Sequence, residues 1–389
     1  MQTKRADVSR SYTYGVSAME TSDISLDAES KSIIERALNR FIDETYEPSA
    51  RRARLNRADL DYRTYWPMLA ELGVLGLSVS SDCGGIGADS RDVCDMLYVL
   101  GRGLLLEPLI EGTVIAGAVL TFSADSGIML PAMVSGEKLT VLVGGRKGDD
   151  LRFASTGLGY ELSGIARVVP GAAQADIWLI PCVDEGGVWR ILRVTASAAA
   201  ARVLNYRMMD GREACDVGFE SMVVSPSDVM LEGPLAESAM AAASAAAVSA
   251  YAAEAAGVMH NLVSITSDYL RTREQFGVHI SSFQALQHRL ANMHMAALEA
   301  RAMSRAMAKS VDEALDKAQS DRIRWLRYAV PSVIARCSAC VGHDAIQMHG
   351  GMGVTDELIV SHCNSRLVVL SKLLERWSTG SVAVVQAMN

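Results

Sequence analysis

Basic, aromatic and amide side chains gather around one predicted break between two helices in the C-terminal third of the sequence. Arg271 and Arg273 stand near the end of the first helix, which breaks at Gly277. The second helix is predicted to begin at Ser282, a residue type that caps helix N-termini. Because a guanidinium group can bind two phosphate oxygens at once, this corner could hold a pyrophosphate. The side chains that could stack on a purine or hydrogen-bond to its edge are Phe283, Gln284 and Gln287.

The same corner belongs to a pattern that is known from one protein family. Residues 269–277 read Tyr-Leu-Arg-Thr-Arg-Glu-Gln-Phe-Gly, and residues 282–293 read Ser-Phe-Gln-Ala-Leu-Gln-His-Arg-Leu-Ala-Asn-Met. A second block at residues 347–357 reads Gln-Met-His-Gly-Gly-Met-Gly-Val-Thr-Asp-Glu. Both blocks, and the distance between them, resemble the acyl-CoA dehydrogenases. Looser matches at residues 66–77 and 84–87 extend the resemblance over most of the chain.

The resemblance implies FAD as the cofactor and gives roles to residues of both blocks. Arg273 would bind the pyrophosphate, and Gln347 would make a polar contact from the second block. Gly350 and Gly351 would let backbone amides come close to the cofactor. The other residues of the implied groove are Gln275, Phe276, Ile280, Phe283 and Gln284. For the two phenylalanines, packing in the protein core is an equally good explanation.

The implied reaction, α,β-desaturation of an acyl-CoA thioester, needs a carboxylate that removes the α-proton while the flavin takes the β-hydride. The position of the family's base after Gly350 falls at Leu374, and Glu375 lies one residue further. Glu375 is therefore a candidate catalytic base, with a solvated helix position as the alternative interpretation. Some family members place the base on the long helix instead, where this chain has Ala247.

Other positions that face the substrate in the family are also altered here. Glu254 follows Ala247 by two helical turns, which displaces it by about 10 Å, and it could instead be a buried acid paired with a neighbouring chain. The positions that hold the CoA arm in many relatives are Ala245 and Val248. The loop expected against the flavin ring, residues 143–150, contains no hydroxyl side chain, and we predict a flexible hairpin there.

The motifs for the adenosine half of FAD are thus complete, whereas those for the flavin ring and the base are eroded. We therefore predict the smaller subunit of a heteromeric acyl-CoA dehydrogenase, which completes the FAD site of a partner chain. The resemblance implies a bulky acyl-CoA substrate, such as a steroid side chain or a dicarboxylate, and an acceptor such as an electron-transfer flavoprotein. Two alternatives stay open: a self-sufficient homo-oligomeric dehydrogenase or oxidase that uses Glu375, and a non-catalytic scaffold subunit without flavin.

The elements that must position these residues follow from hydrophobic periodicity and indicate an α+β fold of the acyl-CoA dehydrogenase type. Residues 1–27 are predicted as a loose tail, and apolar residues at helical spacing predict a helical domain over 28–137. Short β-rich runs predict a middle β domain over 138–232. Residues 233–389 predict a four-helix bundle, which opens with a helix of about 40 residues, or about 60 Å. Its last helix is predicted to begin at Thr355.

Composition argues against several classes of partner. The formal net charge of -8 and the pI near 5.5 come without a Lys/Arg-rich run of the kind that suggests nucleic-acid binding, so nucleic acid is disfavoured as a partner. The apolar run 235–258 is rich in Ala and is interrupted by Glu237 and Glu254, so a membrane span is disfavoured as well. The polar N-terminus lacks the apolar centre of a secretory signal, and we expect a cytoplasmic protein.

The cysteines fit free thiols better than a metal or redox site. There are seven, an odd number, and they are scattered along the chain. Cys337 and Cys340 form a CxxC pair, but a zinc site would need a second pair of ligands and none is recognisable. We expect both to be buried structural thiols and expect no metal.

Overall fold

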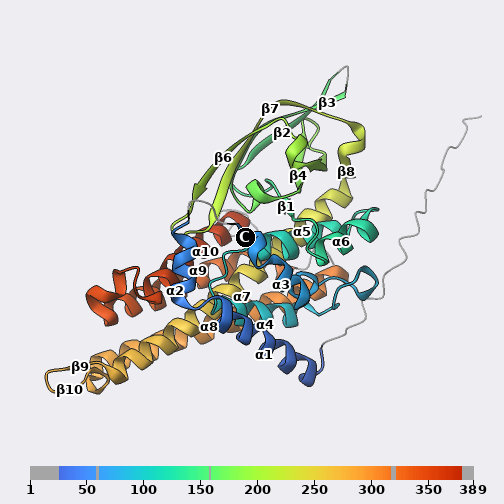
Figure 1. The fold of residues 1–389 in the computed structure, drawn as a ribbon. Coiled ribbons are helices and arrows are strands. Elements are labelled where there is room, and N and C mark those ends of the chain that lie inside the picture. Colours follow the sequence, from blue (N-terminus) through green and yellow to red (C-terminus); the bar gives the residue numbers. More distant parts are fainter. Residues whose placement is uncertain (1–25, 58–60, 157–158, 317–320, 379–389) are drawn as a thin grey trace, which may run out of the picture.

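The computed structural model describes residues 26–57, 61–156, 159–316 and 321–378 (Figure 1). The tail predicted at residues 1–27 therefore lies almost entirely outside the described residues. Helices come first along the chain, then one β-sheet, then four long helices. This architecture confirms the predicted α+β fold class with an N-terminal helical part, a middle sheet and a C-terminal helical bundle.

Among the described residues, the N-terminal part consists of six helices, of which α1 and α4 begin with an aspartate cap. The Asp27 side chain accepts a hydrogen bond from Ser30 N at 2.7 Å, and Asp89 accepts one from Asp92 N at 2.8 Å. Between α4 and α5 lies a π-helical turn, η4, at Ile110–Ile115. The helices are α1 Ala28–Thr45, α2 Pro48–Leu55, α3 Trp66–Glu71, α4 Ser90–Gly101, α5 Ala116–Leu120 and α6 Ser126–Val134.

The middle part is an 8-stranded sheet with the order β6-β7-β3-β2-β4-β5-β8, in which β1 pairs with β4 in parallel. In Figure 1 it stands above the helices, and β8 leads from it into the long helix α7. The strands are β1 Thr140–Leu142, β2 Asp150–Thr156, β3 Gly159–Pro170, β4 Ile177–Asp184, β5 Trp189–Thr195, β6 Ala201–Arg207, β7 Glu213–Val224 and β8 Val229–Glu232.

The C-terminal part contains the helices α7 Pro234–Thr272, α8 Gln284–Asp316, α9 Asp321–His349 and α10 Ile359–Trp377. Helix α7 has 39 residues, close to the predicted length. A hairpin of β9 Glu274–Gln275 and β10 Val278–His279 joins α7 to α8. In Figure 1 the ends of α7 and α8 carry this hairpin away from the rest of the molecule, as a projecting arm.

Two predicted helix starts are wrong. Ser282 ends a 3-10 turn, and its hydroxyl donates to the His279 carbonyl at 2.7 Å, so α8 begins only at Gln284. Thr355 directly follows another 3-10 turn, η9 Gly350–Val354, and α10 begins at Ile359. Both hydroxyls bond to nearby carbonyls of a turn, which is the usual competitor of helix capping.

Helices α4 and α7 cross with their backbones in direct contact. A Cβ atom on Gly257 of α7 would lie 2.0 Å from the Tyr98 carbonyl oxygen, and one on Gly101 of α4 would lie 2.5 Å from the Glu254 carbonyl oxygen. Neither neighbour is a movable side chain. This crossing therefore requires glycine on both helices, and it sets the distance between the N-terminal helices and the bundle.

We predict that Gly257→Ala lowers the free energy of unfolding by about 3 kcal/mol, because the new methyl group must push two backbones apart. The matched control is Gly127→Ala in α6, where an added Cβ meets no atom within 4 Å. That variant should change stability by less than about 1 kcal/mol. Urea denaturation of both variants measures the difference, and equal midpoints would contradict the close crossing.

Candidate functional site

A cavity of about 730 Å³ opens where the end of α7, the start of the hairpin and the η9 turn meet. Most of the predicted cofactor residues line it, although they come from two segments that are far apart in the sequence. These are Arg273, Gln275, Ile280, Gln347, Gly350 and Gly351. The two segments of the sequence motif are therefore brought together around one space of a size that suits a ligand.

The glycines of the η9 turn leave this space open. A Cβ atom on Gly350 or Gly351 would meet no atom within 4 Å, and Gly350 has a φ of +62°. Gly353 differs, because a Cβ there would lie 2.8 Å from the Ile346 carbonyl oxygen. Gly350 and Gly351 thus allow close approach of a ligand to the backbone, whereas Gly353 allows the turn to pack on α9.

The remaining predicted cofactor residues do not line the cavity. Phe276, at the tip of the hairpin, is 91% exposed with a φ of +54°, and Phe283 is 37% exposed. Their rings meet edge to face, with centroids 6.2 Å apart. Gln284 is also exposed. Within this chain the core-packing explanation is therefore wrong for Phe276, and the three side chains form part of an exposed surface on the arm.

Two further residues of the cavity wall were not identified from the sequence. The rings of Tyr269 and His349 stack with centroids 4.3 Å apart and an interplanar angle of 26°. Burial lowers the pKa of His349, and its Nδ1 lies 2.8 Å from the Ala345 carbonyl oxygen. Both residues lie inside the two sequence blocks. A polar residue directly before Gly350 was the signal that could have identified His349.

The region where the resemblance places the flavin ring is closed, in contrast to the cavity beside Arg273. The loop at residues 143–150 is bound to the end of α10, because Lys147 N donates to the Arg376 carbonyl at 3.0 Å. The Arg376 guanidinium donates to Asp149 at 2.7 Å and also to the Arg167 carbonyl. Burial and the nearby Arg146 guanidinium lower the pKa of Arg376. The predicted flexible hairpin is wrong, since ion pairs and backbone bonds anchor this loop.

The neighbouring face of α7 is closed as well. Trp377, the last residue of α10, is buried, and its carbonyl accepts a hydrogen bond from the Ser244 hydroxyl at 3.2 Å. Arg327 of α9 donates to the same hydroxyl oxygen at 2.6 Å. The positions where relatives hold a base or the CoA arm are fully packed; they are Ala245, Ala247 and Val248.

Glu375 points away from this packed region. Its side chain is 56% exposed and pairs with Lys372, one helical turn earlier on α10, at 3.1 Å. The following residue, Arg376, is the one that faces the β domain. Glu375 thus occupies the solvated helix position that was its alternative interpretation, and its role as a base stays a prediction.

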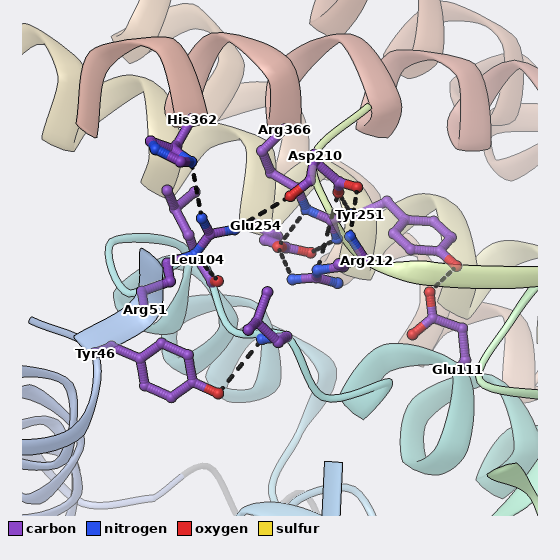
Figure 2. A network of polar contacts seen from close by, with 11 residues as sticks. Tyr46, Arg51, Leu104, Glu111, Asp210, Arg212, Tyr251, Glu254, His362 and Arg366 are labelled. Atoms are coloured by element: carbon purple, nitrogen blue, oxygen red, sulfur yellow. Dashed lines mark hydrogen bonds and ion pairs between the residues drawn. The ribbon is translucent and has the colours of Figure 1, made fainter. Parts of the chain in front are cut away.

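Glu254 is the centre of a buried ion network, which Figure 2 shows. Arg366 of α10 holds both carboxylate oxygens, at 2.8 and 2.6 Å, and Arg212 donates to one of them at 2.9 Å. Arg366 also donates to Asp210 at 2.8 Å. The prediction of a buried acid is confirmed, but the expected partner is wrong, because both guanidinium groups belong to the same chain.

The network joins all three parts of the molecule. Arg51 of α2 donates to the Leu104 carbonyl at 3.0 Å and to His362 of α10 at 3.1 Å. Since the other nitrogen of His362 lies 3.1 Å from the Asp356 carbonyl, which can only accept, Nδ1 is the acceptor for Arg51. Beside the network, the Tyr251 hydroxyl donates to Glu111 of the π-helical turn at 2.7 Å.

The possible metal ligands among the remaining side chains do not cluster in the described part of the chain. Among the described residues no group of three or more His, Cys, Asp or Glu side chains could hold a metal ion. Cys337 is buried, and burial raises the pKa of its thiol to about 11, whereas Cys340 is only partly buried. In the same part of the chain, no helix has both the length and the hydropathy to cross a membrane.

We predict that Glu254→Gln destabilises the protein by about 3 kcal/mol, because Arg366 and Arg212 then share a single buried counter-charge, that of Asp210. Burial would raise the pKa of Glu254, but the two guanidinium groups hold it below its ordinary value. The stabilisation is therefore fully present above the unfolded-state pKa and is lost as the pH falls through the lower folded-state pKa. Urea denaturation between about pH 7 and pH 3 should therefore show a larger loss of stability for the wild type than for Glu254→Gln, in which the other ion-paired carboxylates are unchanged.

Glu375→Gln serves as the matched control, since it makes the same change at an exposed surface pair. Its effect on stability should be less than about 1 kcal/mol. If both variants lost the same stability, or if Glu254→Gln lost as much stability on acidification as the wild type, the network would not stabilise the fold as described.

Two models of one protein family match most of the chain. Residues 28–137 match the family model "Acyl-CoA dehydrogenase, N-terminal domain", and residues 237–373 match "Acyl-CoA dehydrogenase, C-terminal domain". Acyl-CoA dehydrogenase FadE34 of Mycobacterium tuberculosis is 28% identical over 309 residues, 76% of this chain and 38% of that protein. The chain thus spans less than half the length of this relative.

Solved structures share the same fold. One, a variant of the "Tcur3481-Tcur3483 steroid ACAD", has a TM-score of 0.78 and 24% identity over 92% of this chain and 96% of its own. Another, "Crystal structure of the ChsE4-ChsE5 complex from Mycobacterium tuberculosis", has a TM-score of 0.78 and 21% identity over 93% and 97%. At these identities the similarity establishes the fold alone.

Proposed function

Because this chain belongs to the acyl-CoA dehydrogenase family, we propose that it is a subunit of a heteromeric acyl-CoA dehydrogenase that completes the FAD site of a partner chain. The observation that carries this proposal is a contrast within one chain. The cavity beside Arg273 is open and lined by the cofactor motif, whereas the region around Trp377 is closed. The partner supplies the base and the ring site.

The cavity residues suit the adenosine diphosphate half of FAD. Arg273 brings a guanidinium for the pyrophosphate, and its side chain is exposed toward solvent. The glycines at 350 and 351 leave their backbone free for close approach, and Gln275 and Gln347 offer amide groups. When bound, FAD supplies the acceptor for a hydride from the acyl chain.

The closed region explains why this chain needs a partner. A flavin ring between the 143–150 loop and α10 would have to displace the ion pair of Arg376 with Asp149, both of which are largely buried. A base at Ala247 is missing, and Glu375 faces solvent. Removing an α-proton requires a carboxylate within hydrogen-bonding reach of the substrate, and this chain offers none at that place.

The exposed arm suits contact with a second acyl-CoA dehydrogenase-like chain. Phe276 and Phe283 are exposed at its tip, and Met295 and Leu298 are exposed along α8. Apolar side chains of this kind on one helix and its adjoining hairpin favour a protein partner. Two of the similar structures are named as pairs of different chains, which favours a heteromer over a homo-oligomer.

The substrate and electron acceptor extend the same proposal. We infer a bulky acyl-CoA thioester, with a steroid acyl group as the first candidate, because one similar structure is named a steroid dehydrogenase of this family. An electron-transfer flavoprotein would reoxidise the flavin, and the complex would work in the cytoplasm.

We predict that Arg273→Ala in the assembled heteromer lowers the flavin content at least tenfold, because the pyrophosphate loses a charge-assisted contact. Flavin absorbance per complex measures this, and circular dichroism checks the fold. The matched control is Arg271→Ala, because Arg271 lies outside the cavity lining and pairs with Asp268 on the exposed end of α7. Equal flavin loss in both variants would argue against the assignment of Arg273.

Glu375→Gln separates the proposal from the self-sufficient alternative. In the heteromer this change should leave turnover of acyl-CoA within about twofold, since the side chain faces solvent and pairs only with Lys372. Loss of more than about a hundredfold with the flavin retained would identify Glu375 as the base. A heteromer in which no flavin depends on this chain would leave only the scaffold alternative.

A further inference from the structure

The stacked pair of Tyr269 and His349 forms part of the cavity wall that the proposed function does not yet use. His349 is buried, with 4% of its surface exposed, yet it borders the cavity directly before the open glycine turn. Tyr269 lies one helical turn before Arg273, whose backbone N donates to the Tyr269 carbonyl at 2.9 Å. The imidazole therefore belongs to the same cavity wall as Arg273 and the glycine turn, the two groups assigned to the cofactor.

The hydrogen bonding of His349 fixes what its ring can do. Nδ1 lies 2.8 Å from the Ala345 carbonyl oxygen, which can only accept, so Nδ1 carries a proton. In the neutral ring Nε2 is then a lone-pair acceptor, and it has no hydrogen-bond partner among the described residues. Burial lowers the pKa of His349, which favours this neutral form near pH 7.

His349 Nε2 differs from its neighbours in the cavity wall in the kind of ligand atom that it can bind. Arg273 and the backbone of the glycine turn are donors, so they suit phosphate oxygens. A neutral imidazole acceptor needs an N–H or O–H donor from the ligand. The stack on Tyr269 keeps the ring in one orientation, so that its acceptor has a defined direction.

Resting on the proposed function, we propose that His349 Nε2 accepts a hydrogen bond from the adenosine part of the cofactor, through either the adenine amino group or a ribose hydroxyl. The residue then selects for an adenine nucleotide, whereas Arg273 selects only for phosphate. His349 binds the cofactor and takes no part in proton transfer, because the adenosine half is remote from the reacting flavin ring.

The test is titration calorimetry of ADP with the purified full-length chain. The variants are His349→Phe, which keeps a stacking ring without the acceptor, and His349→Gln, which keeps an acceptor. His343→Phe, at an exposed position of α9, is the matched control. We expect ADP to bind about five- to tenfold more weakly to His349→Phe and as in the wild type to His343→Phe, with partial rescue by His349→Gln. Urea denaturation checks that each variant is folded.

Two analogues identify the donor. If the adenine amino group is the donor, IDP should bind to the wild type as weakly as ADP binds to His349→Phe. The His349→Phe variant should then bind ADP and IDP equally well. If a ribose hydroxyl is the donor, 2′-deoxy-ADP or 3′-deoxy-ADP should show this pattern instead. A purely structural role for His349 would weaken all nucleotides alike, and this outcome overturns the inference.

The Arg273→Ala variant distinguishes a failure of the inference about His349 from a failure of the proposed function. If it weakens ADP binding and folded His349→Phe does not, the inference about His349 is wrong and the proposed function stands. If the wild type binds no ADP, or Arg273→Ala binds it unchanged, the cofactor assignment of the cavity fails and takes the inference with it.

Discussion

The fold depends on the small side chains of α7, because this helix is packed on all sides by the other elements. It packs against α4, α8, α9 and α10, and it also contacts the sheet and the π-helical turn. Its middle is almost entirely alanine and is buried on every side, with Gly257 where α4 comes closest. Larger side chains there would separate elements that reach α7 from three parts of the chain.

Because most side chains of α7 are apolar, they offer few hydrogen-bond partners to the polar side chains that are buried between the domains. These polar side chains must therefore pair largely with one another. The network around Glu254 and Arg366 meets this need with guanidinium and carboxylate groups from the turn between β6 and β7, from α7 and from α10. Arg51 extends it to α2. Such buried ions contribute little net stability compared with apolar packing, but breaking one leaves its partner uncompensated. The network therefore fixes how the domains sit together.

The sequence was sufficient for the order of the domains, the length of α7 and most of the residues that line the cavity beside Arg273, because these follow from periodicity and from two local motifs. It was insufficient where partners are distant. The sequence around Glu254 does not predict its partners Arg212 and Arg366, because each of them lies in a distant segment of the chain. Capping preference placed helix starts at Ser282 and Thr355, whereas both residues lie at the ends of 3-10 turns and the helices begin further along the chain. Arg376 and Trp377 read as an ordinary helix end, although they close the region beside α7.

The packing around Ala247 has an evolutionary consequence. Ala247 is 0% exposed, so a glutamate placed there would be buried in a packed site, at a cost of several kcal/mol. Regaining a base would also require the loop that Arg376 anchors to be released. Several changes would have to occur together before any of them improved fitness. In the heteromer that we propose, dependence on a partner chain for the base would therefore be easier to acquire than to reverse.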